Sequence, residues 1–471
     1  MPSKTSKMIT DKIYTTFVHY CIVPFITKFL KPMVDGTSEQ ILVDLPSIGK
    51  CFTFGGQKKL TANNNETDAV TLRIDHPVQF CWSLLLDQKI GLGESYMNGD
   101  WCARPGIKHF LTALIRAKRE KSEARRRSST STSSSSSSSL PPSPPSSSLF
   151  LSSLGRKSLD AFRALVALYN YCLHRVRDNT ILRSRKNISE HYDLGNDMFE
   201  LFLDDSMTYS CALFEEEDVN KEVVSPVDFV HLKDAQLRKI DALLDTLNLG
   251  PNDHVLEIGC GWGAAAIRAV QRFGCRWTGL TISTEQLEMA QERVREVGLE
   301  DSIDLKLLDY RLETGSFSAV VSIEMIEAVG EKFLPEYFQV IYDRLAEGGK
   351  AAIQAIICPD AYYDRYCRSS DFIKKHIFPG GHMPSVGAIE KSLPLSSDLT
   401  PLFKFNVERE MAAHYSHTLD TWLAAWDDRE KDITSLGYSS TFHRKWQFYF
   451  GLCSALFAYN NIDVIQFTLK K

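Results

Sequence analysis

The feature that most constrains the fold is an alternation of strand-like and helix-like segments between residues 255 and 357. Short apolar runs, such as 255–258 and 277–282, alternate with longer amphipathic runs, such as 285–297 and 331–345. Consecutive parallel strands need a crossover between them, and a helix usually supplies it. The pattern therefore predicts an α/β fold with a doubly wound, mainly parallel sheet.

A serine- and proline-rich stretch divides the chain. Residues 133–139 are all serine, and four prolines lie within 141–145. Such a composition buries too little apolar surface to offset the entropy lost on ordering, so we expect 119–154 to be a disordered linker. It would separate a smaller mixed α+β domain at 37–118 from a larger domain at 155–471.

The N-terminal segment 1–36 is rich in apolar residues but also carries charges, and Pro24 lies in its middle. Its longest uncharged run is too short and too polar for a confident membrane span, and no signal peptide is apparent. We expect an apolar helical segment that either packs on the body of the protein or lies at a membrane surface.

Composition narrows the classes of partner. With 54 basic and 59 acidic side chains the net charge is −5, so nothing in the balance points to nucleic acid. The 11 cysteines have no Cys-x-x-Cys spacing, and a chain of 471 residues does not need a disulfide framework. We therefore expect no nucleic-acid partner, no metal site and a reducing, cytoplasmic environment.

The strongest local motif is VLEIGCGWG at residues 255–263. An apolar strand ends in Glu257 and is followed by glycines at alternate positions, Gly259, Gly261 and Gly263. Glycine allows a sharp turn into a helix and a close approach of the backbone to a ligand. A dinucleotide site has Gly-x-Gly-x-x-Gly and an acidic residue after the next strand, whereas here that strand ends in GLTIS. These differences favour S-adenosylmethionine (SAM).

Several motifs together resemble the cyclopropane-fatty-acyl-phospholipid synthase family of class I SAM-dependent methyltransferases. They are VLEIGCGWG, GLTISTEQLEMAQERV, LLDYR and SIEMIEAVG, with HYDLGND and MTYSCA upstream and SDFIK and IFPGG downstream. The resemblance covers 187–466, and GLGESYMNGDW at 91–101 is similar to the family's N-terminal lipid-binding domain. It implies a seven-stranded Rossmann-like methyltransferase sheet, and transfer of a methylene from SAM to a cis double bond of a phospholipid acyl chain, forming a cyclopropane fatty acid.

The resemblance also implies which residues line the SAM site. They are Tyr209, Ser210, Gly259, Gly261, Thr281, Gln286, Tyr310 and Arg311. Thr281 and Gln286 would offer polar groups to the ribose, and Tyr310 could stack near the adenine. Asp309 could accept a hydrogen bond from the adenine amino group, and Glu257 could pair with an amino group of the ligand.

Ring formation requires a base that removes a proton from the transferred methyl group in a site closed to water. The resemblance implies a bicarbonate ion as this base, held by Cys211, Glu327, Tyr415 and a backbone group of Ile356. Bacterial relatives usually have a histidine where this chain has Gln354, which can donate to an anion but carries no charge. We expect Glu327→Gln to retain SAM binding and to reduce turnover severely.

Other functions remain open at this stage. The same fold could methylate a small amine or a sphingolipid, or form a methyl-branched lipid, and Gln354 would also suit a non-catalytic lipid- or SAM-binding protein. The expected partners are membrane phospholipid acyl chains and the membrane surface, to which the protein would be peripheral. We also consider a homodimer.

Overall fold

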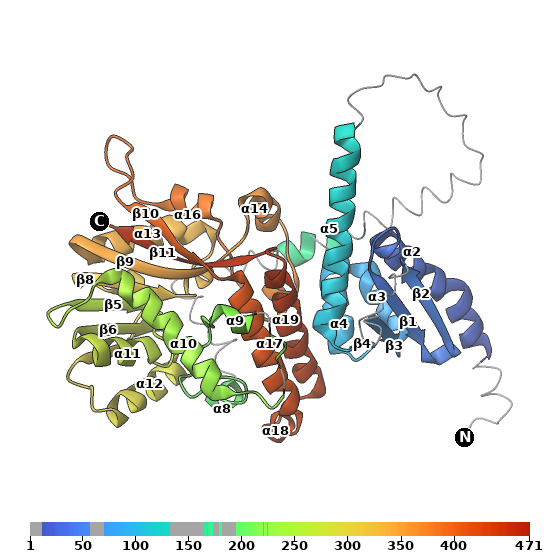
Figure 1. Cartoon of the computed structure of the whole chain (residues 1–471), viewed down its shortest axis with the longest axis horizontal. Helices are drawn as coiled ribbons and strands as arrows, with labels where there is room; N and C mark the ends of the chain where they lie inside the picture. The colour runs from blue at the N-terminus through green and yellow to red at the C-terminus, as the bar shows by residue number, and fades with distance from the viewer. Residues whose placement is uncertain are drawn as a thin grey trace. The chain divides into compact units, whose positions relative to one another are not determined.

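The computed structural model describes residues 12–56, 70–131, 162, 164–166, 168–172, 179–180, 195–219, 221–223 and 225–471. The chain forms two compact units: Met1–Asn170 with Ser440–Ala455, and Tyr171–Ser439 with Leu456–Lys471 (Figure 1). The predicted linker beyond residue 131 and the start of the HYDLGND motif, 191–194, lie outside the described residues.

The first unit contains a four-stranded sheet in the order β2-β1-β3-β4. The strands are β1 (Gln40–Leu45), β2 (Lys50–Gly55), β3 (Val70–Ile74) and β4 (Trp101–Arg104). Strand β1 pairs in parallel with β3, and the other pairs are antiparallel. The helices are η1 (Val18–Ile22), η2 (Pro46–Ile48), α2 (Val23–Val34), α3 (Pro77–Leu86), α4 (Gln88–Met97) and α5 (Ile107–Ser131). The unit combines helices with a mixed sheet and extends beyond the 37–118 region predicted from the sequence.

Helix α5 corrects the predicted linker, because residues 119–131 are helical rather than disordered. This stretch is dominated by lysine, arginine, glutamate and alanine, which favour helix, and the serines begin only at its end. Two contacts also anchor it: Glu120 accepts a hydrogen bond of 2.7 Å from the backbone N–H of Ser38, and Lys121 donates to the carbonyl of Pro32. Tertiary contacts therefore extend the folded region.

Most of helix α19 (Ser440–Ala458) belongs to the first unit, which corrects the prediction of one continuous domain at 155–471. Arg444 donates hydrogen bonds to the carbonyls of Tyr96 and Trp101, at 2.5 and 2.6 Å. Its guanidinium also lies over the Tyr96 ring, 4.1 Å from the centroid. These contacts join the GLGESYMNGDW segment to a helix more than three hundred residues later, which no local pattern indicates.

The N-terminal helical segment contains one described helix, Lys12–Val34, that is long and apolar enough to cross a membrane by length and composition alone. Buried core helices and signal sequences pass the same test, so this finding does not assign a span. The exposed fractions of Ile13 (65%) and Tyr20 (73%) show that part of its apolar surface is open.

The second unit is built on a seven-stranded sheet in the order β10-β11-β9-β8-β5-β6-β7, which confirms the predicted doubly wound, mainly parallel sheet. Its strands are β5 (His254–Ile258), β6 (Arg276–Thr281), β7 (Ile303–Leu307), β8 (Phe317–Ile323), β9 (Leu345–Ile357), β10 (Lys404–Glu410) and β11 (Asp463–Lys470). Strands β5 to β9 pair in parallel, and β11 runs antiparallel to both β9 and β10.

Helices cover both faces of this sheet (Figure 1). One face packs on α10 (Phe229–Leu244), α11 (Ala264–Phe273) and α12 (Thr284–Glu296), and the other on α13 (Leu334–Arg344) and α16 (Val386–Ser392). Successive strand residues alternate between the two cores, as Val255 and Leu256 do, because strand side chains point to opposite faces.

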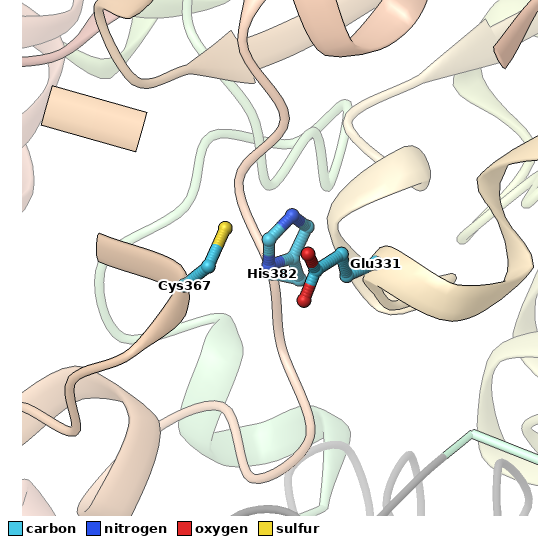
Figure 2. A group of neighbouring side chains, drawn as sticks. All are labelled: Glu331, Cys367 and His382. Atoms are coloured by element: carbon cyan, nitrogen blue, oxygen red, sulfur yellow. The ribbon is translucent and has the colours of Figure 1, made fainter. Parts of the chain in front are cut away.

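The remaining helices connect and extend these layers. They are α8 (Asn196–Phe199), α9 (Glu216–Val219), α14 (Asp360–Cys367), α15 (Phe372–His376), α17 (Ala412–Asp428), α18 (Glu430–Ser435) and the 3₁₀ turns η3 (Asp245–Leu247), η4 (Tyr310–Leu312), η5 (Ile326–Ala328) and η6 (Glu331–Phe333). Figure 2 shows that η6, the end of α14 and the loop before α16 bring Glu331, Cys367 and His382 together.

Close packing at Gly279 in β6 gives a first prediction. A Cβ atom there would lie 2.7 Å from Cδ2 of Leu305 and 3.0 Å from Cβ of Cys260. We expect Gly279→Ala to lower the free energy of unfolding by about 1–3 kcal/mol, measured by urea denaturation. The control is Gly250→Ala, because a Cβ at Gly250 would meet only the Asp253 carboxylate, at 3.8 Å. Equal losses in both variants would contradict this packing argument.

Candidate active site

A pocket lies at the carboxyl ends of the central strands of the second unit. Strands β6 and β7 lie on one side of β5 and strands β8 and β9 on the other, so the order reverses between β5 and β8. Ligands of open α/β sheets bind at such a reversal. Of the residues predicted for SAM, those that line this pocket are Tyr209, Ser210, Glu257, Gly259, Gly261, Thr281, Gln286, Asp309, Tyr310 and Arg311.

The glycine turn has the shape that the sequence predicted. Gly259 (φ 84°) and Gly261 (φ 50°) both have left-handed backbone conformations that disfavour side chains. A Cβ at Gly259 would collide with Met325, whereas one at Gly261 would have no neighbour within 4 Å. The backbone at Gly261 is therefore open to a ligand such as SAM. Gly263 does not line the pocket; it precedes α11, and a Cβ there would meet Ala290 at 3.4 Å.

Hydrogen bonds hold the polar residues of the pocket in place. Thr281 donates to the side-chain carbonyl of Gln286 at 3.1 Å. Both carboxylate oxygens of Asp309 accept from Arg311, at 2.8 and 2.7 Å, so the first role of Asp309 is to orient that guanidinium. Glu257 accepts from the indole N–H of Trp277 at 2.9 Å, and burial raises the pKa of Glu257 to about 7.

A part-buried carboxylate that was not predicted from the sequence, Glu324, lies at the centre of the predicted base site. Its Oε1 accepts hydrogen bonds from the backbone N–H of Cys211 at 2.8 Å and from Nε2 of Gln354 at 2.7 Å. Its Oε2 accepts from the hydroxyl of Tyr415 at 2.9 Å. Burial raises the pKa of Glu324, while the charge of Lys239 and these hydrogen bonds oppose the shift. Glu324 also lines the SAM pocket.

The second acid, Glu327, is also part-buried and is bonded differently. One carboxylate oxygen accepts from the backbone N–H of Ile356, and the other has no hydrogen-bond partner among the described residues. Burial, and then the neighbouring Glu324, raise the pKa of Glu327 to about 8, so Glu327 is mainly protonated at neutral pH. Glu324 differs from it in having Lys239 and three hydrogen-bond donors, which favour its charged form.

This arrangement does not fit the bicarbonate ion that the resemblance implied. Cys211, Gln354 and Tyr415, the donors expected to hold the ion, bond to Glu324, and the N–H of Ile356 bonds to Glu327. A carboxylate presents the same planar pair of oxygens as bicarbonate, and here it is part of the chain. The Cys211 side chain is not an acid, because burial raises the pKa of its thiol.

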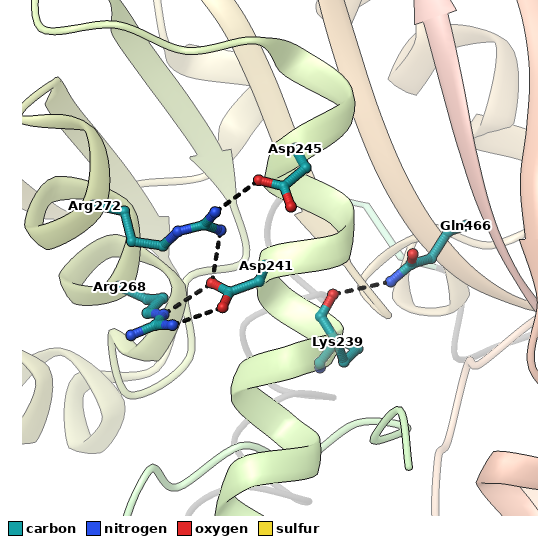
Figure 3. A network of polar contacts seen from close by, with 6 residues as sticks. All are labelled: Lys239, Asp241, Asp245, Arg268, Arg272 and Gln466. Carbon is teal, nitrogen blue, oxygen red and sulfur yellow. Dashed lines mark hydrogen bonds and ion pairs between the residues drawn. The ribbon is translucent and has the colours of Figure 1, made fainter. Parts of the chain in front are cut away.

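Two buried amides orient this centre. Gln466 on β11 donates to Oε1 of Gln354 at 3.0 Å. It also donates to the backbone carbonyl of Lys239 at 3.2 Å, as Figure 3 shows. Because Oε1 of Gln354 is engaged, its Nε2 faces Glu324. Gln354 and Gln466 are fully buried and form a neutral pair of hydrogen-bonded amides. Gln354 occupies the position at which bacterial relatives typically have a histidine.

Lys239 is fully buried, and its charge acts on Glu324. Its Nζ donates to the hydroxyl of Ser210 at 2.5 Å. Burial lowers its pKa to about 8, against the raising effect of Glu324 and other acidic groups. The helix that carries it is anchored by Asp241, which accepts 2.8 Å hydrogen bonds or ion pairs from Arg268 and Arg272 of α11 (Figure 3).

The sequence predicted many of the residues that line the pocket, but it did not predict Glu324, Lys239 or Asn179. Glu324 follows strand β8 directly, and an acidic residue at the carboxyl end of a central strand is a signal that could have identified it. Lys239 lies on the buried, otherwise largely apolar face of α10, which is also detectable as a break in the helical pattern. Asn179 lines the pocket and accepts from Arg311 through its backbone carbonyl, which leaves no trace in sequence.

The fold and the pocket together define the class of protein. A doubly wound seven-stranded sheet with a glycine turn after its central strand, and a pocket lined by the predicted residues, is a class I SAM-dependent methyltransferase. The family model described as mycolic acid cyclopropane synthetase matches residues 180–467. The chain belongs to this cyclopropane synthase family.

Individual relatives agree with this assignment. The chain is 34% identical to the tuberculostearic acid methyltransferase of Mycobacterium tuberculosis over 381 residues, which is 81% of this chain and 78% of the relative. It is 30% identical to the cyclopropane-fatty-acyl-phospholipid synthase of Escherichia coli over 417 residues, or 86% and 89% of the two chains.

Solved structures of related enzymes are also similar. A cyclopropane synthase from Mycobacterium tuberculosis superposes with a TM-score of 0.53 at 30% identity, covering 61% of this chain and 98% of the other. A mycolic acid cyclopropane synthase complexed with SAH and CTAB gives the same TM-score, identity and coverage. SAH is the product that SAM leaves after methyl transfer, which supports SAM as the methyl donor here.

Proposed function

We propose that this protein transfers a methylene group from SAM to the cis double bond of an unsaturated phospholipid acyl chain, forming a cyclopropane ring. The observation that carries the proposal is Glu324, a part-buried carboxyl group at the edge of the SAM pocket that three donors hold in place. In a methyltransferase acting on a hydroxyl or an amine, a base would remove a proton from the acceptor atom. With an alkene substrate the base must instead remove a proton from the transferred methyl group, because the ring closes only when that proton is lost.

The residues of the pocket are suited to each step of this reaction, from methyl addition to proton removal and ring closure. Bound SAM would supply an electrophilic methyl group, and its addition to one alkene carbon leaves a cation on the other. Glu324 then accepts a proton from the transferred methyl group, and the electrons of that C–H bond close the ring onto the cationic carbon. Tyr415 and the N–H of Cys211 hold the carboxylate in place. The products are the ring-containing chain, SAH and a proton.

An aromatic cluster beside the pocket is suited to protecting the cation from water. The Tyr209 ring lies 5.4 Å from Phe199, 5.9 Å from Phe202 and 5.2 Å from Trp422, between ring centroids. Trp422 in turn lies 6.1 Å from Tyr415. Aromatic faces attract cations, and their bulk excludes water that would otherwise quench the reaction.

A second product is favoured by one comparison. The relative that matches 81% of this chain is a tuberculostearic acid methyltransferase, whose name describes methylation of a fatty acid rather than cyclopropane formation. The same cation gives a methylene branch if a neighbouring hydride shifts before Glu324 removes the methyl proton. The two products differ by the fate of one hydrogen, and the experiment below separates them.

We further propose that the first unit docks on an anionic phospholipid membrane from the cytoplasmic side. Exposed apolar side chains on the N-terminal helix, such as Ile13 and Tyr20, would enter the interface, together with Trp82, which is 60% exposed. The exposed residues Arg125, Arg126 and Arg127 of α5 supply basic charge for lipid phosphates. Apolar insertion combined with positive charge is the usual means of peripheral membrane binding.

The test is incubation of the purified chain with SAM and vesicles of a cis-monounsaturated phospholipid, with acyl products read by mass spectrometry and proton NMR. We expect acyl chains heavier by one CH₂ with upfield ring-methylene signals. The same mass gain with vinylidene signals would assign the branched product instead. Vesicles of saturated phospholipid are the control. A chain that binds SAM but modifies neither lipid would overturn the proposal.

Tyr415 offers a test of the base itself. Its hydroxyl donates to Glu324 and lowers the pKa of that carboxyl, so Tyr415→Phe should raise this pKa further. We expect turnover at pH 7 to fall about tenfold and the acid limb of the pH profile to move to higher pH. Tyr362→Phe, at a residue that is 59% exposed, should change neither. An unshifted acid limb in Tyr415→Phe would contradict the assignment of Glu324.

A further inference from the structure

A second group of potential ligands lies outside the SAM pocket. The ligating atoms of Glu331, Cys367 and His382 all lie within 4.8 Å of one another (Figure 2). None of the three lines the SAM pocket. Among the described residues this is the one group of three or more histidine, cysteine or acidic side chains close enough to hold an ion.

Three separate segments build this cluster. Glu331 begins η6 after Gly330, Cys367 is the last residue of α14, and His382 lies in the loop before α16. The Glu331 side chain is exposed, Cys367 is half-buried and His382 is buried. The buried His382 gives the group a well-packed ligand, and the exposed Glu331 side chain has room to turn toward an ion.

The chemistry of the donors selects the kind of ion. Thiolate, imidazole and carboxylate together suit zinc, whereas magnesium and calcium prefer oxygen ligands alone. In a tetrahedral zinc site the ligating atoms lie roughly 3.5 Å apart, so the present spacing requires a small rotation of the Glu331 or Cys367 side chain. Tyr363 completes the surroundings, since its hydroxyl lies 2.9 Å from Nε2 of His382 and hydrogen-bonds with Cys367.

An ion bound at this position would have to displace the thiol proton of Cys367. Burial and the charge of Glu331 raise the pKa of the Cys367 thiol, while Lys374 lowers it. A divalent cation would replace the thiol proton and neutralise Glu331, which is the usual coupling between metal binding and deprotonation.

We propose that Glu331, Cys367 and His382 bind a zinc ion that ties α14 and the loop before α16 to the turn carrying Glu327. The backbone N–H of His382 donates to the carbonyl of Glu327 at 2.8 Å, and Glu331 follows in the same segment. The ion would thus stabilise the base site from outside, without touching the reacting atoms. This departs from the sequence-based expectation of no metal site.

Cobalt substitution tests the proposal without any activity measurement. The full-length protein is stripped with a chelator and titrated with Co²⁺, and the thiolate-to-cobalt charge-transfer absorption is recorded; Zn²⁺ is then titrated by calorimetry. We expect one ion per chain, displacement of cobalt by zinc, and a rise in melting temperature on zinc binding.

Substitutions of single residues test which side chains bind the metal ion. Cys367→Ser should abolish the charge-transfer band, and His382→Asn should weaken zinc binding at least tenfold. Cys358→Ser, which removes a nearby cysteine outside the group, and Cys102→Ser in the first unit should keep the band. SAM binding by each variant establishes that it is folded. A band that survives in Cys367→Ser, or zinc affinity unchanged in both ligand variants, would overturn the proposal, whatever lipid the enzyme modifies.

Discussion

Replacing Glu324 by glutamine is expected to lower turnover by about 10²–10⁴-fold while SAM binding changes less than about threefold. Glutamine can still accept hydrogen bonds from the N–H of Cys211 and from Gln354, and its amide can donate to the Tyr415 oxygen, so the site keeps its shape. It cannot accept the methyl proton. Single-turnover product formation and SAM calorimetry on the same preparation measure the two effects.

The matched control is Glu327→Gln, three residues further along the chain. Glu327 is mainly protonated at neutral pH, and a glutamine side chain copies both its shape and its acceptance of the Ile356 N–H. We therefore expect a much smaller loss than in Glu324→Gln. This revises the severe loss predicted for Glu327 from the sequence. If turnover fell more in Glu327→Gln than in Glu324→Gln, Glu327 rather than Glu324 would be the base.

Replacing the buried Lys239 by methionine is expected to lower turnover at pH 7 by about 10- to 100-fold and to move the acid limb upward by about one to two pH units. Methionine fills similar space but removes the positive charge that lowers the pKa of Glu324. The carboxyl of Glu324 then stays protonated to higher pH and cannot act as a base. Measured turnover between pH 6 and 9 should recover in part at the alkaline end.

Lys233→Met is the control for Lys239→Met, because Lys233 lies on the same helix with 41% of its side chain exposed and pairs only at the surface with Asp205. Such exposed pairs contribute little, so its pH profile should match that of the unchanged protein. A loss of turnover in Lys239→Met that is equal at every pH would show a structural role instead. In that case the charge of Lys239 would not be what lowers the pKa of Glu324.

Local patterns determined much of the fold. The βαβ alternation and the apolar strand ending in Glu257 predicted the parallel sheet and the position of its glycine turn, since both depend on short-range periodicity and on glycine's tolerance of positive φ. The prediction of a disordered linker from residue 119 onward was wrong for residues 119–131, which are helical. Hydrogen bonds from Ser38 and to Pro32 hold α5 there, and composition cannot report such distant partners.

The sequence by itself determined the class of enzyme and the position of the glycine turn, and it predicted a set of residues that the fold brings to one pocket. Only the tertiary structure decided what they surround. Cys211, Gln354 and Tyr415 come from three distant segments, and their donors meet on the carboxylate of Glu324 rather than on a separate anion. The identity of a hydrogen-bond partner depends on which buried polar groups the folded chain brings within reach, because each must be satisfied away from water. That pairing exists only once the sheet and its covering helices are assembled.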